Sequence, residues 1–189
     1  MNYKVIGGKK LSGSVETNTS KNAAVALLAA SLLNRGTTTL RRMPKIQEVE
    51  RLIEFMQSIG VSVTRGSGEI RITPPDTFDF SNPNVESAER TRSIAMFIAP
   101  LAHRLNSFEL PAPSGCDLGK RSLGAHIDAL AKLGIQIIGN EKAHTYHVER
   151  KELRPTEIIM YEASDTGTEN VLMAAAKIPG KTIIKFASA

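Results

Sequence analysis

Apolar and polar positions follow a pattern that recurs along the chain with a period of roughly seventy residues. The recurrence divides the chain into units at about 20–75, 88–150 and 156–189. Each unit opens with a helix that is apolar on nearly every side, which is typical of a buried helix, and a short strand follows it. In the first two units an amphipathic helix and a β-hairpin come next. The pattern therefore predicts a mixed α/β fold built from repeats.

The spacing predicts helices at about 20–34, 46–59, 88–104, 122–133 and 168–180, strands at 37–40, 107–110 and 181–186, and hairpins at 61–73 and 135–148. Gly36, Gly60, Gly134 and Gly180 are expected to end helices, because glycine favours the residue just beyond a helix C-terminus. Pro100 is expected to kink or bend the helix at 88–104.

The third unit stops after its first helix and strand, at the last residue of the chain. Its amphipathic helix and hairpin are missing, which would leave apolar surface uncovered. We therefore expect a fragment, or one half of an assembly completed by another chain. The alternative is a short divergent protein whose last helix and strand simply finish a sheet.

Composition narrows the class of protein. The 189 residues include one cysteine, so an internal disulfide is excluded and a reducing compartment is favoured. No N-terminal apolar segment resembles a signal peptide, and we expect a cytoplasmic protein without membrane insertion. The net charge of +5 is scattered and few aromatic residues accompany it. Pockets for small phosphates or carboxylates explain this charge better than a nucleic-acid surface does.

The cysteine, Cys116, lies in a loop rich in proline and glycine, and Lys120 and Arg121 follow it. Nearby cations stabilise a thiolate and lower the pKa of a cysteine. Structural cysteines prefer apolar surroundings, which this segment lacks. The residues alone leave two hypotheses open, a functional thiol or an inert one in a turn.

Cations also stand at predicted helix starts. Lys21 and Asn22 open the first helix, and Arg90 and Arg92 open the equivalent helix of the second unit. A lysine in a first turn opposes the helix dipole, so it indicates an anion site unless it is simply solvated. Neither a P-loop nor metal-ligand spacing occurs, so we expect no metal or cofactor. His126 could face such a site, although a structural role fits equally well.

Four segments together resemble the enolpyruvyl transferase family: Leu11-x-Gly13-x-Val15, Ser20-Lys21-Asn22-Ala23-Ala24, Gly115-Cys116-x-x-Gly119-x-Arg121, and Ser164-x-x-x-Thr168-Glu169-Asn170. Lys-Asn-Ala-Ala and the Gly-Cys-x-x-Gly loop favour the branch that acts on a UDP-sugar over the shikimate branch. The resemblance implies domains of three inverse βαβαββ units, an α/β prism. It also implies that residues 20–189 form an incomplete first domain, that residues 1–19 pack with a second domain, and that this second domain is absent.

The implied reaction moves the enolpyruvyl group of phosphoenolpyruvate onto the 3-hydroxyl of UDP-N-acetylglucosamine in peptidoglycan synthesis. By resemblance Cys116 is the general acid, the adduct-forming residue and the fosfomycin target, while Lys21 and Arg121 are phosphoenolpyruvate-binding cations. The remaining residues implied to bind substrate are Asn22, Arg92, Ser122, Leu123, Gly124, Ala125, Glu162, Ala163, Ser164 and Asp165.

Two departures from the family pattern bear on the nucleotide sugar. Ser122-Leu123-Gly124-Ala125 replaces a segment with proline and aspartate, and Asp165 replaces an apolar residue. The chain also lacks the second-domain aspartate and arginine of the family, so we expect no turnover from it alone. The alternative function is a non-catalytic protein that binds a phosphorylated ligand or nucleotide sugar on the same fold.

Overall fold

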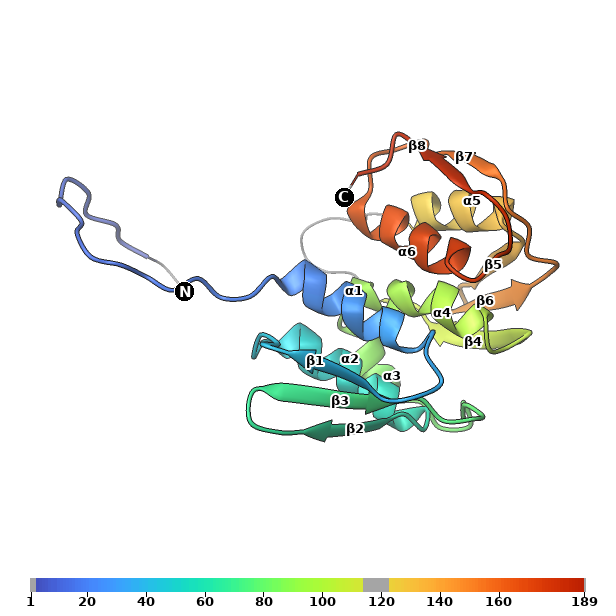
Figure 1. The fold of residues 1–189 in the computed structure, drawn as a ribbon, viewed down its shortest axis with the longest axis horizontal. Coiled ribbons are helices and arrows are strands. Elements are labelled where there is room, and N and C mark those ends of the chain that lie inside the picture. The colour runs from blue at the N-terminus through green and yellow to red at the C-terminus, as the bar shows by residue number, and fades with distance from the viewer. Residues whose placement is uncertain (1–2, 114–122, 189) are drawn as a thin grey trace.

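A computed structural model describes residues 3–113 and 123–188. Helices α1, α4 and α6 lie in the middle of the molecule, and three small sheets lie around them (Figure 1). The helices are α1 (Lys21–Ser31), α2 (Gln47–Ser58), α3 (Val85–Glu89), the 3-10 helix η1 (Arg92–Phe97), α4 (Ile98–Ala102), α5 (Gly124–Lys132) and α6 (Asp165–Ala175). The strands are β1 (Thr38–Arg41), β2 (Ser62–Arg65), β3 (Glu69–Thr73), β4 (Ser107–Pro111), β5 (Ile135–Asn140), β6 (Thr145–Arg150), β7 (Glu157–Ile159) and β8 (Ile183–Lys185).

The first two sheets repeat one topology, which confirms the predicted repeat. Their strand orders are β1-β3-β2 and β4-β6-β5, and every neighbouring pair is antiparallel. In each unit the second helix ends at a glycine with positive φ, Gly60 at +93° and Gly134 at +97°. The third sheet is the parallel pair β7-β8 on either side of α6 in sequence. The sequence pattern missed β7, a strand of only three residues.

The predicted continuous helix at 88–104 was wrong. The segment forms α3, η1 and α4, and the break comes at Arg90–Thr91 rather than at Pro100. Thr91 has extended backbone angles, and its side chain accepts a hydrogen bond from the Ser93 amide at 3.1 Å, which starts a new helix. Pro100 lies in the first turn of α4, where its missing amide hydrogen costs little.

The first helix was also predicted too long and too buried. It ends at Ser31 with Leu32 as C-cap, well before Gly36. Leu27 is 50% exposed, so one side of α1 faces solvent. Ser20 caps the N-terminus by accepting a hydrogen bond from the Ala23 amide at 3.3 Å.

The core is continuous between the first and second units. Phe55 of α2 and Phe97 of η1 are fully buried and stack with ring centroids 5.7 Å apart. Asn170 of α6 is also fully buried, and it hydrogen-bonds to the backbone of Ala95 and Ala99. These contacts join α2 to η1 and join α6 to η1 and α4.

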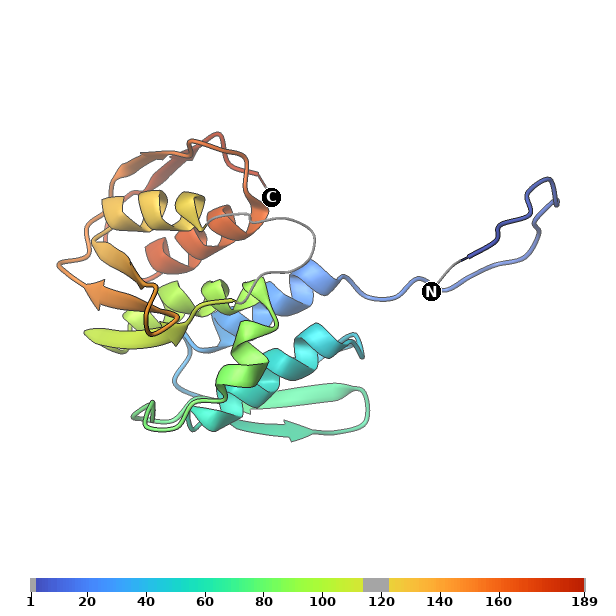
Figure 2. The same ribbon diagram turned by 180° about the vertical axis from the view of Figure 1, so that it is seen from behind.

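Residues 3–18 form no helix or strand and extend away from the rest of the chain as an exposed arm (Figures 1 and 2). Tyr3, Val5, Leu11 and Val15 are each more than four-fifths exposed. The packing of this arm against a second domain stays a prediction. In the described residues no helix has the length and apolarity that a bilayer crossing requires.

Candidate functional site

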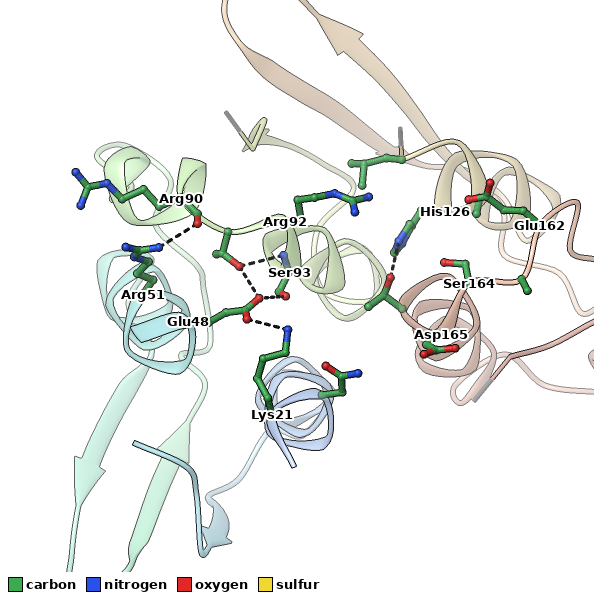
Figure 3. A pocket seen from close by; sticks show the side chains of 16 residues that line it. Lys21, Glu48, Arg51, Arg90, Arg92, Ser93, His126, Glu162, Ser164 and Asp165 are labelled. Atoms are coloured by element: carbon green, nitrogen blue, oxygen red, sulfur yellow. Dashed lines mark hydrogen bonds and ion pairs between the residues drawn. The ribbon is translucent and has the colours of Figure 1, made fainter. Parts of the chain in front are cut away.

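A pocket of about 880 Å³ opens where the first turns of α1, α2, η1, α5 and α6 approach one another (Figure 3). It gathers polar side chains from all three units. Its walls are Lys21, Asn22, Glu48, Arg51, Arg90, Thr91, Arg92, Ser93, Leu123, Ala125, His126, Glu162, Ala163, Ser164, Asp165 and Thr166.

Nine of the residues expected to bind substrate therefore lie around one cavity: Lys21, Asn22, Arg92, Leu123, Ala125, Glu162, Ala163, Ser164 and Asp165. Gly124, the first residue of α5, is not among the lining residues. Cys116, Arg121 and Ser122, together with Lys120, lie outside the described residues.

Glu48 organises the end of the pocket formed by the first two units. Its carboxylate accepts hydrogen bonds from the hydroxyls of Thr91 at 3.0 Å and Ser93 at 2.5 Å. Its other oxygen pairs with the Lys21 ammonium at 2.9 Å, and Figure 3 shows the two side chains facing each other from α2 and α1. Burial by itself raises the pKa of Glu48, but the hydrogen bonds from Ser93, Lys21 and Thr91 outweigh it and lower the pKa. The carboxylate is thus charged, and it balances the first-turn lysine of α1.

The expectation that Arg90 opens a helix was wrong, because Arg90 is the C-cap of α3. A cation suits that position, since the C-terminus of a helix carries partial negative charge. Its guanidinium pairs with Glu86 at 2.9 Å and points away from the Lys21–Glu48 pair. Its carbonyl accepts a hydrogen bond from Arg51 at 3.1 Å. Arg92, by contrast, is the first residue of η1, as expected.

His126 lies on the opposite side of the pocket, in the first turn of α5. Its ring is 4% exposed, with Nδ1 at 3.1 Å from the amide nitrogen of Asn170 and Nε2 at 3.2 Å from the Thr166 hydroxyl. Burial, with a smaller contribution from the positive charge of Arg92, lowers the pKa of His126 to about 4. The imidazole is therefore neutral at physiological pH.

The start of α6 forms the remaining wall. Ser164 is the N-cap and accepts a hydrogen bond from the Gly167 amide at 3.1 Å. A Cβ at Gly167 would lie 2.9 Å from the Ser164 hydroxyl oxygen, so glycine permits this close approach. Asp165 stands in the first turn and accepts a hydrogen bond from the Ser188 hydroxyl. Burial and the nearby Asp165 raise the pKa of Glu169.

Charge is divided across the pocket. Lys21, Arg51 and Arg92 come from the first two units, whereas Glu162 and Asp165 come from the third. Because of this division, anionic groups of a ligand fit the side formed by α1, α2 and η1.

Among residues 3–113 and 123–188, no three His, Cys, Asp or Glu side chains cluster as metal ligands would.

Sequence reasoning missed Glu48, Arg51, Thr91, Ser93 and Thr166 as pocket residues. The sequence held a signal for Glu48 only: it is a charged residue in the first turn of a helix, as Lys21 is. The others depend on the break before η1 and on the packing of α2 against it, which the hydrophobic pattern does not show.

The family model and the curated relatives that match this chain all describe carboxyvinyltransferases. The family model for EPSP synthase (3-phosphoshikimate 1-carboxyvinyltransferase) matches residues 5–189. The UDP-N-acetylglucosamine 1-carboxyvinyltransferase of Thermobifida fusca is 33% identical over 192 residues, which cover 98% of this chain and 44% of that protein. The enzyme of the same name from Bacteroides fragilis is 31% identical over 193 residues, covering 96% and 43%. The chain thus spans less than half the length of these curated relatives.

Solved structures share the fold at low sequence identity. The enolpyruvyl transferase NikO from Streptomyces tendae has a TM-score of 0.74 at 18% identity, covering 94% of this chain and 42% of that one. EPSP synthase from Acinetobacter baumannii has a TM-score of 0.70 at 16% identity, covering 91% and 40%. These matches confirm the enolpyruvyl transferase fold predicted from the sequence.

Proposed function

This chain belongs to the EPSP synthase (3-phosphoshikimate 1-carboxyvinyltransferase) family, and from that membership we propose that it supplies one wall of the active site of a UDP-N-acetylglucosamine enolpyruvyl transferase. The reaction would serve peptidoglycan synthesis. The names of its curated relatives support this assignment. The observation that carries it is that residues of α1, η1, α5 and α6 that the family resemblance had indicated line one pocket.

Phosphoenolpyruvate carries a phosphate and a carboxylate, so its site needs several cations. Lys21 stands at the N-terminus of α1, where unpaired backbone amides add to its charge, and Asn22 follows it. Arg121 would supply a further cation. The Lys21 ammonium is half exposed and already oriented by Glu48, so a ligand anion can reach it without breaking the core.

In the proposed chemistry the sugar 3-hydroxyl gives its proton to a base of the second domain and its oxygen bonds to C2 of phosphoenolpyruvate, while the π electrons of the C2–C3 double bond take the proton of the Cys116 thiol onto C3. This addition gives a tetrahedral intermediate and a thiolate. The thiolate then takes a proton back from C3 as the C2–O bond to phosphate breaks, which restores the double bond in the enolpyruvyl ether and releases phosphate. Protonation of carbon needs an acid of tuned pKa, and cations beside Cys116 would provide the tuning.

Arg92, Leu123, Ala125 and the segment 162–165 would contact the UDP-sugar. Glu162 and Asp165 put negative charge on this part of the wall. We therefore expect them to meet hydroxyl or amide groups of the ligand, and Arg92 to meet its phosphates.

The 189-residue chain is expected to bind substrate weakly and to have no turnover, because transition-state contacts require both walls of a cleft. Calorimetric titration with UDP-N-acetylglucosamine and with phosphoenolpyruvate tests binding, and phosphate release tests turnover. Lys21→Met should weaken phosphoenolpyruvate binding, whereas Lys142→Met, which removes an exposed lysine from a turn, should not. Phosphate release by the chain alone would overturn its expected inactivity, and equal binding by both variants would overturn the role of Lys21.

The non-catalytic alternative remains a distinct hypothesis with its own outcome. Under the proposed function, a longer protein that contains this chain loses activity on Cys116→Ser. Under the alternative, that longer protein binds the ligand but releases no phosphate, with or without the substitution.

A further inference from the structure

Asn170 has one possible orientation in the core. Its Oδ1 accepts a hydrogen bond from the Ala99 amide at 3.2 Å, which only an oxygen can do. Its Nδ2 donates to the Ala95 carbonyl at 2.8 Å, which only the amide nitrogen can do. Because Asn170 is fully buried, both contacts hold it without exchange with water. The second hydrogen on Nδ2 therefore points to His126.

This contact fixes the tautomer of His126. The Asn170 nitrogen lies 3.1 Å from Nδ1 of His126 and can only donate, so Nδ1 must be the unprotonated acceptor. In a neutral imidazole the proton then sits on Nε2. Nε2 lies 3.2 Å from the hydroxyl oxygen of Thr166 and donates to it. The low pKa of His126, which burial and the charge of Arg92 cause, agrees with a ring that carries one proton.

Thr166 thus receives a hydrogen bond from inside the protein and keeps its own hydroxyl proton for another acceptor. Within the described residues the Thr166 hydroxyl donates no hydrogen bond of its own, and Thr166 lines the pocket. Figure 3 draws the His126 contact as a dashed line toward the first turn of α6. In each hydrogen bond of this relay the group nearer the core is the donor: Asn170 donates to His126, and His126 donates to Thr166.

We infer that the relay Asn170–His126–Thr166 makes the Thr166 hydroxyl a fixed hydrogen-bond donor, which selects an acceptor oxygen of the substrate at the start of α6. This inference rests on the proposed function for its ligand. Thr166 lines the same pocket as the carboxylates of Glu162 and Asp165, which can only accept hydrogen bonds. The wall therefore discriminates by hydrogen-bond polarity, with Thr166 as a specificity-determining residue and His126 and Asn170 as positioning residues.

The tautomer can be tested without any ligand. Long-range proton–nitrogen NMR of the chain labelled at histidine nitrogen distinguishes a protonated from an unprotonated ring nitrogen. His126→Gln identifies the His126 signals among those of the four histidines. We expect Nε2 protonated and Nδ1 unprotonated at neutral pH. A proton on Nδ1, or a doubly protonated ring at neutral pH, would overturn the relay.

The donor role is tested by titrating UDP-N-acetylglucosamine into three variants. Thr166→Val removes the hydroxyl and keeps the shape, and we expect about three- to tenfold weaker binding, the equivalent of one hydrogen bond. Thr166→Ser restores a hydroxyl and should restore most of the affinity. Thr64→Val, on an exposed position of β2, is the matched control and should bind as the unchanged chain does.

The outcomes separate the two proposals. If the unchanged chain binds and Thr166→Val binds equally well, the donor role is wrong while the proposed function stands. If the unchanged chain fails to bind the UDP-sugar, the proposed function and the ligand assigned to Thr166 fail together, and the NMR result still decides the relay.

Discussion

Glu48 gives the sharpest test of how the site is built, because one carboxylate joins three structural elements. Replacing Glu48 by alanine removes the acceptor of two hydroxyls, those of Thr91 and Ser93, and the partner of Lys21. Hydrogen bonds to a charged acceptor contribute about 1.5–3 kcal/mol each when buried. The Glu48 side chain is 25% exposed, so we expect a combined loss of about 2–4 kcal/mol.

The ion pair contributes much less than the two hydroxyl contacts. The Lys21 side chain is 50% exposed, and pairs of that kind contribute below about 1 kcal/mol. Lys21→Ala should therefore change the free energy of unfolding by less than about 1 kcal/mol while it weakens phosphoenolpyruvate binding. We therefore expect Glu48 to contribute mainly to stability and Lys21 to contribute mainly to ligand binding.

Urea unfolding followed by far-ultraviolet circular dichroism measures both variants against the unchanged chain. The native pKa of Glu48 lies below its ordinary value of 4.5, so its stabilisation is complete above that pH and is lost as the pH falls through the native pKa. The difference between the unchanged chain and Glu48→Ala should therefore shrink in acid. A loss for Lys21→Ala as large as that for Glu48→Ala, or a difference independent of pH, would refute this reasoning.

Three further predictions concern the scaffold of the pocket. The pKa of His126 is about 4 in the folded chain and 6.5 ordinarily, so as the pH falls from 6.5 to 4 the unfolded chain takes up a proton first and the free energy of unfolding falls by up to about 3 kcal/mol. Urea unfolding of His126→Gln should therefore show a flatter pH dependence. An unchanged slope would contradict the burial of a neutral ring. Gly134→Ala should cost about 3–5 kcal/mol, because φ is +97° and the new Cβ would lie 2.4 Å from a backbone carbonyl oxygen. Gly68→Ala, at φ +76° with open space around it, should cost only about 1–2 kcal/mol in the same unfolding assay, and equal costs would exclude the clash. Phe97→Ala removes a fully buried ring stacked on Phe55 and should lower the free energy of unfolding by about 3–5 kcal/mol, whereas a loss under about 1 kcal/mol would mean that the core refills the space.

Local patterns were sufficient for the elements whose signal lies within one segment. The amphipathic helix α2 and both hairpins lie where alternation and spacing placed them, and Gly60 and Gly134 end helices as expected. Such signals are local, because the spacing of apolar residues within one helix or hairpin already shows which of its faces is buried. The prediction of one helix at 88–104 failed because the apolar pattern continues across the break. Thr91 starts a new helix there through a single side-chain contact.

The site divides in the same way. The family resemblance indicated Lys21, Arg92 and the segment 162–165, and these line one pocket. No motif pointed to Glu48, whose role depends on hydroxyls more than forty residues away in sequence.

The sequence by itself determined the repeat, the fold class, the family and the residue types of the site, because periodic burial and spaced motifs are properties of the linear chain. Only the tertiary structure decided which groups meet: Glu48 with the start of η1, and Asn170 with His126 and Thr166. These contacts join segments far apart in the chain. Their hydrogen-bond polarity is fixed by burial, which exists only after the units have packed together.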